Sequence, residues 1–385
     1  MRPVPQDARR ESDGGVEDPS GFPVISVVVS TFNRAGLLPA AVEHLVRQAT
    51  TSRYEVIVID NNSTDQTPAV LEEVAARHPR LVRRGFEGRQ GVSHGRNRGI
   101  ELSHAPIVAF TDDDVLVRPD WVEAMVRAMA AHPEVQCVGG RVLPVWKTPP
   151  PSWVTRSHWS PLALVDYGDE PLYVDLARPL CLVTSNVAYR RAALDAIGWF
   201  SPDFPRCQDH ELLLRLWQAG GRGLYLPSIV VECEVPASRL TWAYHRRWHS
   251  EHGRFCALMG AEHAEPGALP DAVPTLFGSP ATTYREFVSS AARCAWLGLR
   301  GRVPEAREAE ALLRDRASFL ATRAGMWRRG KRNALSEIVG FAGAVVTRRR
   351  RRIESSTVSG QWRSACISAA AEAEPSTRRT NEHGA

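Results

Sequence analysis

Three continuous apolar runs restrict this chain to an α/β fold. Residues 24–30, 54–60 and 107–110 consist mostly of β-branched and other apolar side chains, without the strict alternation of a half-exposed strand. Segments with helical apolar spacing lie between these runs. Buried strands that alternate with helices predict a doubly wound α/β sheet.

The alternation of strands and helices continues to about residue 235, and the segments after it are predicted to be helical. We expect helices at 37–48, 93–102, 209–218, 282–300 and 304–328, two more opening at Thr67 and Pro119, and strands at 81–84, 136–141, 180–189 and 224–235. The chain therefore divides into a disordered segment at 1–22, a sheet domain at 23–240, a helical region at 241–346 and a basic, then disordered tail at 347–385.

Polar residues stand where the predicted strands end. Thr31, Asp60 and Asp112 each follow an apolar run, and Asp113 and Asp114 continue the last of them. Ligands of open α/β sheets bind beyond the carboxyl ends of the strands. Consecutive carboxylates repel one another unless a cation neutralises them, and hard Mg²⁺ or Mn²⁺ prefers oxygen ligands. The alternative is a solvated acidic loop.

Composition excludes several classes of protein. The seven cysteines form no C-x-x-C pair, which favours reduced thiols in a cytoplasmic protein over a disulfide framework. No apolar run reaches about 18 residues, and the first residues are polar, so we expect neither a transmembrane helix nor a signal peptide. Arginine carries nearly all the positive charge, but no nucleic-acid-binding motif accompanies it, so we expect no nucleic-acid partner.

Two aromatic segments leave alternatives open. Residues 144–161 contain three prolines in a row and Trp146, Trp153 and Trp159; this segment is either a structural loop or an acceptor-side surface on which sugars stack. The helical region at 241–346 either lies on the protein surface or forms a basic, aromatic region that contacts a membrane peripherally.

Seven short stretches match the motifs of one family in their order along the chain. They are VVVSTFNR at 27–34, DNNSTD at 60–65, GVSHGRNRG at 91–99, FTDDD at 110–114, TSNVAYRR at 184–191, IGWF at 197–200 and QDHEL at 208–212. The chain resembles the family 2 inverting glycosyltransferases of the GT-A fold over about residues 24–260. The resemblance implies a Rossmann-like mixed sheet flanked by helices, with 23–240 as the glycosyltransferase domain.

The resemblance also implies a donor site for a nucleotide-diphospho-sugar, usually a UDP-sugar. Thr31, Asn33 and Arg34 look like the nucleotide-binding turn, and Asp60 looks like the carboxylate that binds the base. The other implied donor-binding residues are Asn61, Asp65, Arg96 near the diphosphate, Asp112 near the ribose or the metal, and Asp113 in a supporting role.

The implied chemistry needs a divalent ion and a base. Asp114, with Asp112, looks like the ligand of Mn²⁺ or Mg²⁺. Such an ion stabilises the charge that builds on the leaving diphosphate. Asp209 matches the catalytic base that takes the proton of the acceptor hydroxyl, and Glu211 is the second candidate. Asp209 could instead cap a helix, and Glu211 could instead form a structural ion pair.

The chain departs from the family pattern at two places. Gln208 stands before Asp209, where glutamate is common. Cys233 and Glu234 occupy the register in which many relatives place a metal-binding or diphosphate-binding histidine. Cysteine is softer than Mn²⁺ or Mg²⁺ prefers, so either a glutamate replaces the histidine or this ligand is missing.

The predicted function is therefore metal-dependent transfer of a sugar, with inversion, to a glycan, lipid-linked or small-molecule acceptor. The location expected for such an enzyme is the cytoplasm or the inner face of the membrane. The departures leave a catalytically weak GT-A scaffold as an alternative. A sugar nucleotidyltransferase is disfavoured, because no glycine-rich, basic loop follows the first strand.

Overall fold

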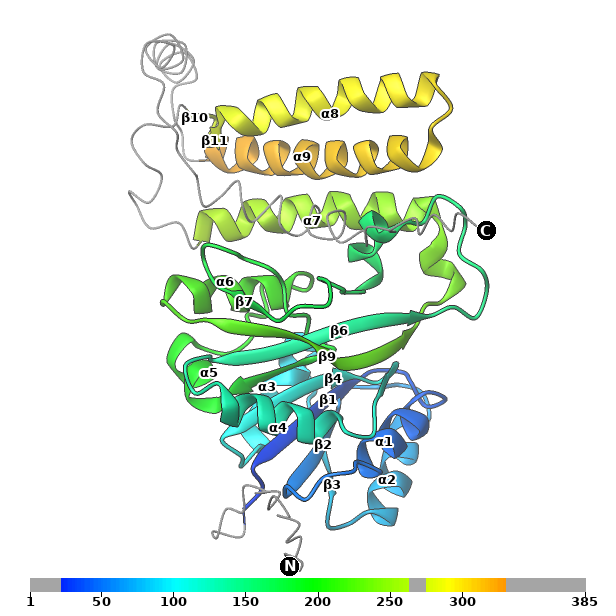
Figure 1. Cartoon of the computed structure of the whole chain (residues 1–385), viewed down its shortest axis with the longest axis vertical. Helices are drawn as coiled ribbons and strands as arrows, with labels where there is room; N and C mark the ends of the chain where they lie inside the picture. Colours follow the sequence, from blue (N-terminus) through cyan, green and yellow to red (C-terminus); the bar gives the residue numbers. More distant parts are fainter. Residues whose placement is uncertain (1–21, 263–274, 330–385) are drawn as a thin grey trace, which may run out of the picture.

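The computed structural model describes residues 22–262 and 275–329. It consists of a sheet with flanking helices and a stack of three long helices at one end (Figure 1). The predicted mixed α/β sheet and helical C-terminal region are confirmed. The expected disorder at 1–21 and in the tail, and the helical prediction for 330–346, fall outside the described residues.

The first half of the sheet is parallel. It comprises β1 (Ile25–Thr31), β2 (Tyr54–Asp60), β3 (Val82–Phe86) and β4 (Ile107–Asp112), in the order β3-β2-β1-β4. The second half adds β8 (Val187–Arg190), β6 (Cys137–Val145), β9 (Gly223–Glu234) and β5 (Val115–Val117), and β7 (Leu172–Val174) pairs with β9. Because β8 runs antiparallel to β4, the sheet is mixed.

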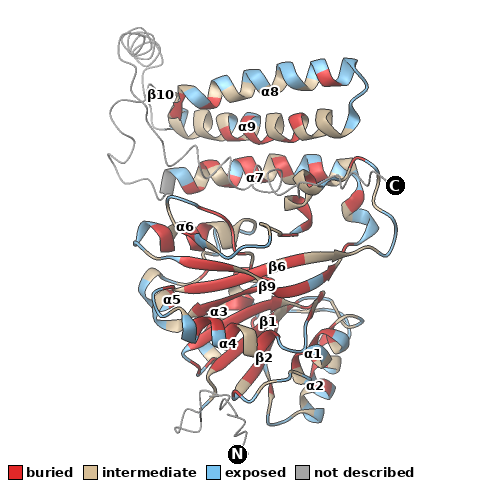
Figure 2. Cartoon of the chain, viewed as in Figure 1, coloured by how far each residue is buried: buried red, intermediate tan, exposed pale blue. Residues whose placement is uncertain are grey.

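Helices cover this sheet and bury its strands. They are α1 (Leu38–Val46), α2 (Thr67–Arg77), α3 (Val92–Leu102), α4 (Trp121–Ala131), α5 (Arg191–Ile197) and α6 (Gln208–Gln218). Figure 2 shows the central strands almost wholly buried. Burial on both faces explains why the apolar runs of β1 and β4 are continuous rather than alternating.

The prediction of one strand over 180–189 is wrong in its first part, since β8 begins only at Val187. The reason is Asn186, whose side chain is fully buried. Its amide donates to the carbonyl oxygens of Arg141 (2.8 Å) and Ile229 (3.1 Å), and its oxygen accepts from Trp121 Nε1 (2.8 Å). The strands β5 and β7 were not predicted, because three residues are too few to show a period.

The C-terminal region contains α7 (Trp242–Glu262), the short pair β10 (Thr275–Leu276) and β11 (Ser279–Pro280), α8 (Ala281–Leu299) and α9 (Val303–Arg329). In Figure 1, α7 lies nearest the sheet, α9 follows and α8 is outermost. Phe255 packs on Phe204, and Trp248 stacks on His252. These aromatic rings contact protein, so membrane contact stays a prediction. None of the helices in the described ranges has the length and hydrophobicity to cross a bilayer.

The helices α7 and α9 approach closely at Gly253. A Cβ atom at Gly253 would lie 2.1 Å from the carbonyl oxygen of Asp315 in α9. Backbone cannot yield as a flexible side chain does, so only glycine fits here. Gly260, seven residues further along the same helix, has open space around it.

We predict opposite effects of one substitution at these two glycines. Gly253→Ala should lower the free energy of unfolding by about 1–3 kcal/mol, because the added methyl group overpacks the α7–α9 contact. Gly260→Ala should raise it by about 0.5–1 kcal/mol, because alanine favours the helix. Chemical denaturation of the full chain, followed by circular dichroism, measures both. Equal effects of the two substitutions would contradict the described helix packing.

Candidate active site

Three polar strand ends meet at one edge of the sheet. In the parallel pairing, Thr31 of β1 lies opposite Asp60 of β2, and Ser30 lies opposite Asp112 of β4. Neighbouring strands lie about 4.8 Å apart. The structure therefore brings together the strand-end residues Thr31, Asp60 and Asp112.

The turn after β1 is held by Asn33. This residue adopts the left-handed region (φ 53°), and its side-chain oxygen accepts the backbone N–H groups of Thr64 (2.8 Å) and Asp65 (3.3 Å). The Asp65 carboxylate in turn accepts the N–H of Thr67 (2.9 Å). In this structure, Asn33 and Asp65 shape the loops at the sheet edge.

Asp60 and Asn61 are both buried after β2. Asp60 Oδ1 accepts the N–H of Ser63 (3.0 Å). The Asn61 amide donates to the carbonyl oxygens of Glu87 (3.2 Å) and Arg89 (2.7 Å), and its oxygen accepts the N–H of Gly91 (2.9 Å). Asn61 therefore ties this loop to the start of α3.

Arg96 on α3 pairs with the first aspartate of the triplet. Its Nη2 atom lies 2.9 Å from Asp112 Oδ1, its guanidinium lies over the Phe200 ring, and its side chain is only 5% exposed. Its Nη1 atom is buried without a hydrogen-bond partner. A buried guanidinium with one unused nitrogen is suited to bind an anionic oxygen.

The surroundings of Asp113 and Asp114 disfavour the charged form of their carboxyl groups. Burial raises the pKa of Asp113 to about 6, and the charges of Asp114 and Asp112 add to this effect. Burial and the neighbouring Asp112 also raise the pKa of Asp114. Thr31 Oγ1 donates to Asp113 (2.6 Å), while Arg34 lies 3.8–3.9 Å from both carboxylates. Adjacent carboxylates in such surroundings gain from a bound divalent cation, and their oxygens are the type of ligand that Mn²⁺ or Mg²⁺ prefers.

Cys233 and Glu234 lie near the aspartates but are engaged elsewhere. Val115, directly after the triplet, pairs with Cys233. Burial is the main reason that the pKa of the Cys233 thiol is raised to about 12, and the charge of Asp114 adds to this effect. Glu234 Oε2 lies 2.5 Å from Lys147 Nζ. A role of either side chain in place of the missing histidine stays a prediction.

The two candidate bases lie on α6 in different surroundings. Asp209 is in the first turn, where its Oδ1 accepts the N–H of His210 (2.9 Å). Glu211 is buried and forms a two-fold ion pair with Arg215 (2.6 and 2.9 Å). Arg215 also donates to the carbonyl oxygen of Gly198, after α5. Through Arg215, Glu211 joins α5 to α6, as expected if Glu211 forms a structural ion pair.

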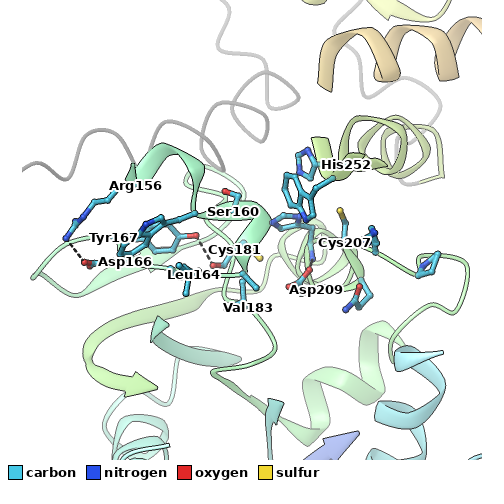
Figure 3. Close-up of a pocket in the computed structure, with 18 residues that line it drawn as sticks. Arg156, Ser160, Leu164, Asp166, Tyr167, Cys181, Val183, Cys207, Asp209 and His252 are labelled. Carbon is cyan, nitrogen blue, oxygen red and sulfur yellow. Dashed lines mark hydrogen bonds and ion pairs between the residues drawn. The ribbon is translucent and has the colours of Figure 1, made fainter. Parts of the chain in front are cut away.

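Asp209 lines a cavity of about 240 Å³ (Figure 3). The facing wall comes from the segment after β6, where Arg156 pairs with Asp166 (3.1 Å) and the Tyr167 hydroxyl donates to the Cys181 carbonyl oxygen (2.9 Å). The cavity therefore combines a carboxylate at a helix start with an aromatic and polar wall.

The chain matches one known family. Residues 26–198 match the model described as Glycosyl transferase family 2. These residues belong to that family. The match covers the parallel strands, the aspartate triplet and β8, and it ends before α6.

Two curated relatives of the family 2 domain are glycosyltransferases by name. A glucosyl-dolichyl phosphate glucuronosyltransferase of Haloferax volcanii is 27% identical over 52% of this chain and 66% of its own length. A validoxylamine A glucosyltransferase of Streptomyces hygroscopicus subsp. jinggangensis is 30% identical over 52% of this chain and 53% of its own length. The chain thus spans between half and two thirds of the length of these relatives.

A solved structure is similar at lower identity. This structure is the mannosyltransferase PcManGT of Pyrobaculum calidifontis in complex with GDP-Man and Mn²⁺. The superposition spans 93% of this chain and 88% of the mannosyltransferase chain. The TM-score is 0.48 and the sequence identity is 19%. The assignment to family 2 rests on the sequence match.

Two tryptophans of residues 144–161 have different surroundings. Trp153 is buried against His158, Trp242 and His245, with ring centroids 4.9–5.4 Å apart, so it is structural. Trp159 lines the cavity.

One charged residue near the aspartates was not predicted. Arg239, before α7, places its Nη2 atom 3.8 Å from Asp114 Oδ2. No motif surrounds Arg239 in the sequence, so only the tertiary structure identifies it.

The buried histidines beside Trp153 predict a pH dependence of stability. Burial lowers the pKa of His158 to about 4 and of His245 to about 3. Below about pH 6.5 these histidines become protonated in the unfolded chain but stay neutral in the native chain. The free energy of unfolding therefore falls as the pH drops from about 6.5 towards 4. The slope is at most about 1.4 kcal/mol per pH unit for each histidine.

His245→Phe keeps the ring contacts and removes one titrating group. Its stability loss between pH 7 and pH 4.5 should be smaller than that of the natural chain, as measured by urea unfolding at each pH. His44→Ala, at an exposed position of α1, is the matched control and should leave the slope unchanged. An unchanged slope in His245→Phe would show that His245 titrates normally in the native state.

Proposed function

We propose that this protein transfers a sugar from a UDP-sugar to an acceptor hydroxyl with inversion of the anomeric centre. The observation that carries the proposal is the meeting of Thr31, Asp60 and the aspartate triplet at one edge of a family 2 sheet. The acceptor belongs to the glycans, lipid-linked sugars or small molecules.

The donor would lie across the ends of β1, β2 and β4. In this proposal Asp60 binds the base, and Thr31, Arg34 and the loops shaped by Asn33 and Asp65 enclose the nucleoside. Arg96 contacts the diphosphate, which its unpartnered Nη1 atom supports. Asp112 orients Arg96 through their ion pair.

Asp114, assisted by Asp112, would hold Mn²⁺ or Mg²⁺. The ion supplies Lewis-acid stabilisation of the leaving diphosphate. Asp113 supports this site through its hydrogen bond with Thr31, which joins the triplet to β1. The proposal assigns no ligand to Cys233, because sulfur is softer than Mn²⁺ or Mg²⁺ prefers, or to Glu234, which is paired with Lys147.

Asp209 would act as the base towards an acceptor in the cavity. Inversion requires a group on the face of the sugar opposite the leaving diphosphate. Asp209 lines the cavity, whereas Glu211 is held by Arg215, so we assign the base to Asp209. Trp159 and Tyr167 offer aromatic surface against which an acceptor can pack.

Substituting the two candidate bases separates their roles. Asp209→Asn should lower kcat by about 10²–10⁴-fold and leave the KM for the donor nearly unchanged, because proton removal is lost while the donor site is intact. Glu211→Gln should mainly lower the melting temperature, because Arg215 loses its buried partner. Turnover assays with a panel of nucleotide sugars, together with thermal unfolding, measure both.

This experiment also tests the catalytically weak alternative. If the natural chain binds a nucleotide sugar but shows neither transfer nor slow donor hydrolysis with Mn²⁺, the scaffold interpretation holds. Mn²⁺-dependent hydrolysis that persists in Asp209→Asn would remove Asp209 from the role of base.

Removal of the proposed metal ligand should separate binding from folding. Asp114→Ala should lose the Mn²⁺-dependent part of UDP affinity, at least about tenfold. Its stability in EDTA should be equal to or higher than that of the natural chain, because one of three crowded carboxylates is gone. Calorimetric titration of UDP with and without Mn²⁺ gives the readout. Glu234→Gln is the control and should bind like the natural chain; full Mn²⁺-dependent binding in Asp114→Ala would contradict the assignment.

A further inference from the structure

A second group of metal-binding side chains lies beside Asp209. Cys207 and His210 come from the start of α6, and His252 comes from α7. Each offers one ligand atom, and these three atoms lie within 4.8 Å of one another. Figure 3 shows Cys207 and His252 on the same side of the cavity, next to Asp209.

The three ligand atoms approach the separations that zinc requires. Zn–S and Zn–N bonds of about 2.3 and 2.0 Å place the ligand atoms of a tetrahedral site about 3.5 Å apart. Cys207 is the N-cap residue of α6 and His210 lies in the first turn of this helix, so both come from the same helix end. Cys256 lies beside His252, with its sulfur 3.6 Å from Nε2 and 3.9 Å from Nδ1, but it is outside the group of three.

The histidine of α7 is oriented as metal-bound histidines usually are. His252 Nδ1 lies 3.0 Å from Asp315 Oδ1 of α9, and both side chains are buried. The other carboxylate oxygen of Asp315 lies 3.0 Å from His249 Nδ1. A carboxylate on one ring nitrogen fixes the other nitrogen as the ligand atom, here Nε2.

The cluster also has an entry path. Cys207, His210 and His252 all line the cavity. An ion can therefore reach the three ligand atoms from the cavity, and its fourth coordination position would face the cavity.

We propose that Cys207, His210 and His252 form a binding site for Zn²⁺, with Asp315 orienting His252. One sulfur and two imidazoles select Zn²⁺ over Mn²⁺ or Mg²⁺, so the site is distinct from the aspartate triplet. The ion would join α6 to the C-terminal helices. Asp209 lies between Cys207 and His210 in the sequence, so the ion would fix the start of the helix that carries it.

The test is titration of the full chain, purified under anaerobic and reducing conditions, with Co²⁺ as the probe. The proposal predicts one Co²⁺ per chain with a sulfur-to-cobalt charge-transfer band and the visible bands of a tetrahedral site, both removed by one equivalent of Zn²⁺. Absence of these bands in the natural chain overturns the proposal.

Variants locate the site. Cys207→Ser and His252→Ala should each weaken Co²⁺ binding at least about tenfold, and each should change the band intensity. Cys294→Ser, a cysteine of α8 that contacts the Ala306 carbonyl oxygen, is the matched control and should bind like the natural chain. An equal loss in Cys294→Ser overturns the assignment. Asp114→Ala should keep the bands; their loss there would place the ion at the aspartates instead.

A measurement on the natural chain tests the proposal without any variant, and therefore also if the variants do not fold. Zn²⁺ should protect Cys207 from alkylation by at least about tenfold in rate, as mapped by mass spectrometry, and should leave Cys294 unprotected. Equal alkylation of Cys207 with and without Zn²⁺ overturns the proposal. None of these readouts needs glycosyl transfer, so their failure is distinguishable from failure of the proposed function.

Discussion

The parallel register of β1 with β2 and β4 is the constraint on which the site depends. It places Thr31 opposite Asp60 and Ser30 opposite Asp112, so residues far apart in the sequence end at one edge of the sheet. A slip of one residue would turn every side chain to the other face. A slip would also break the buried hydrogen bond from Ser26 Oγ in β1 to Glu55 Oε1 in β2 (2.7 Å). The burial of these strands on both faces places Asp113, directly after β4, in surroundings of low polarity.

Those buried acids explain the arrangement of the arginines. Arg96 pairs with Asp112, and Arg34 and Arg239 approach the other two aspartates from different parts of the chain. Arginine keeps its charge and offers several donors in a fixed plane, so it can stabilise an acid at one nitrogen while another stays available. Burial is the main cause of the raised pKa of Asp113, and the charges of Asp114 and Asp112 add to it. Adjacent carboxylates and arginines at one sheet edge are the physical basis for proposing a divalent ion and an anionic diphosphate there.

The helix α6 is held from both sides. On one side the buried Glu211–Arg215 pair attaches it to the carbonyl groups that follow α5. On the other side Cys207 and His210 face α7, and Phe204 packs on Phe255. A side chain in the first turn of a helix held in this way has little freedom to move. We therefore see the C-terminal helices as a support for Asp209 as well as an attachment to the sheet domain.

The sequence by itself determined the alternation of strands and helices, the polar strand ends and the family motifs. These features are local, since period, propensity and short motifs are written in neighbouring residues. The structure decided what depends on distant contacts. It assigned Glu211 to an ion pair, interrupted the strand predicted over 180–189 at Asn186, and brought Arg239 to Asp114. It also joined Cys207 and His210 to His252, because ligand clusters between two helices require a packing angle that no single segment encodes.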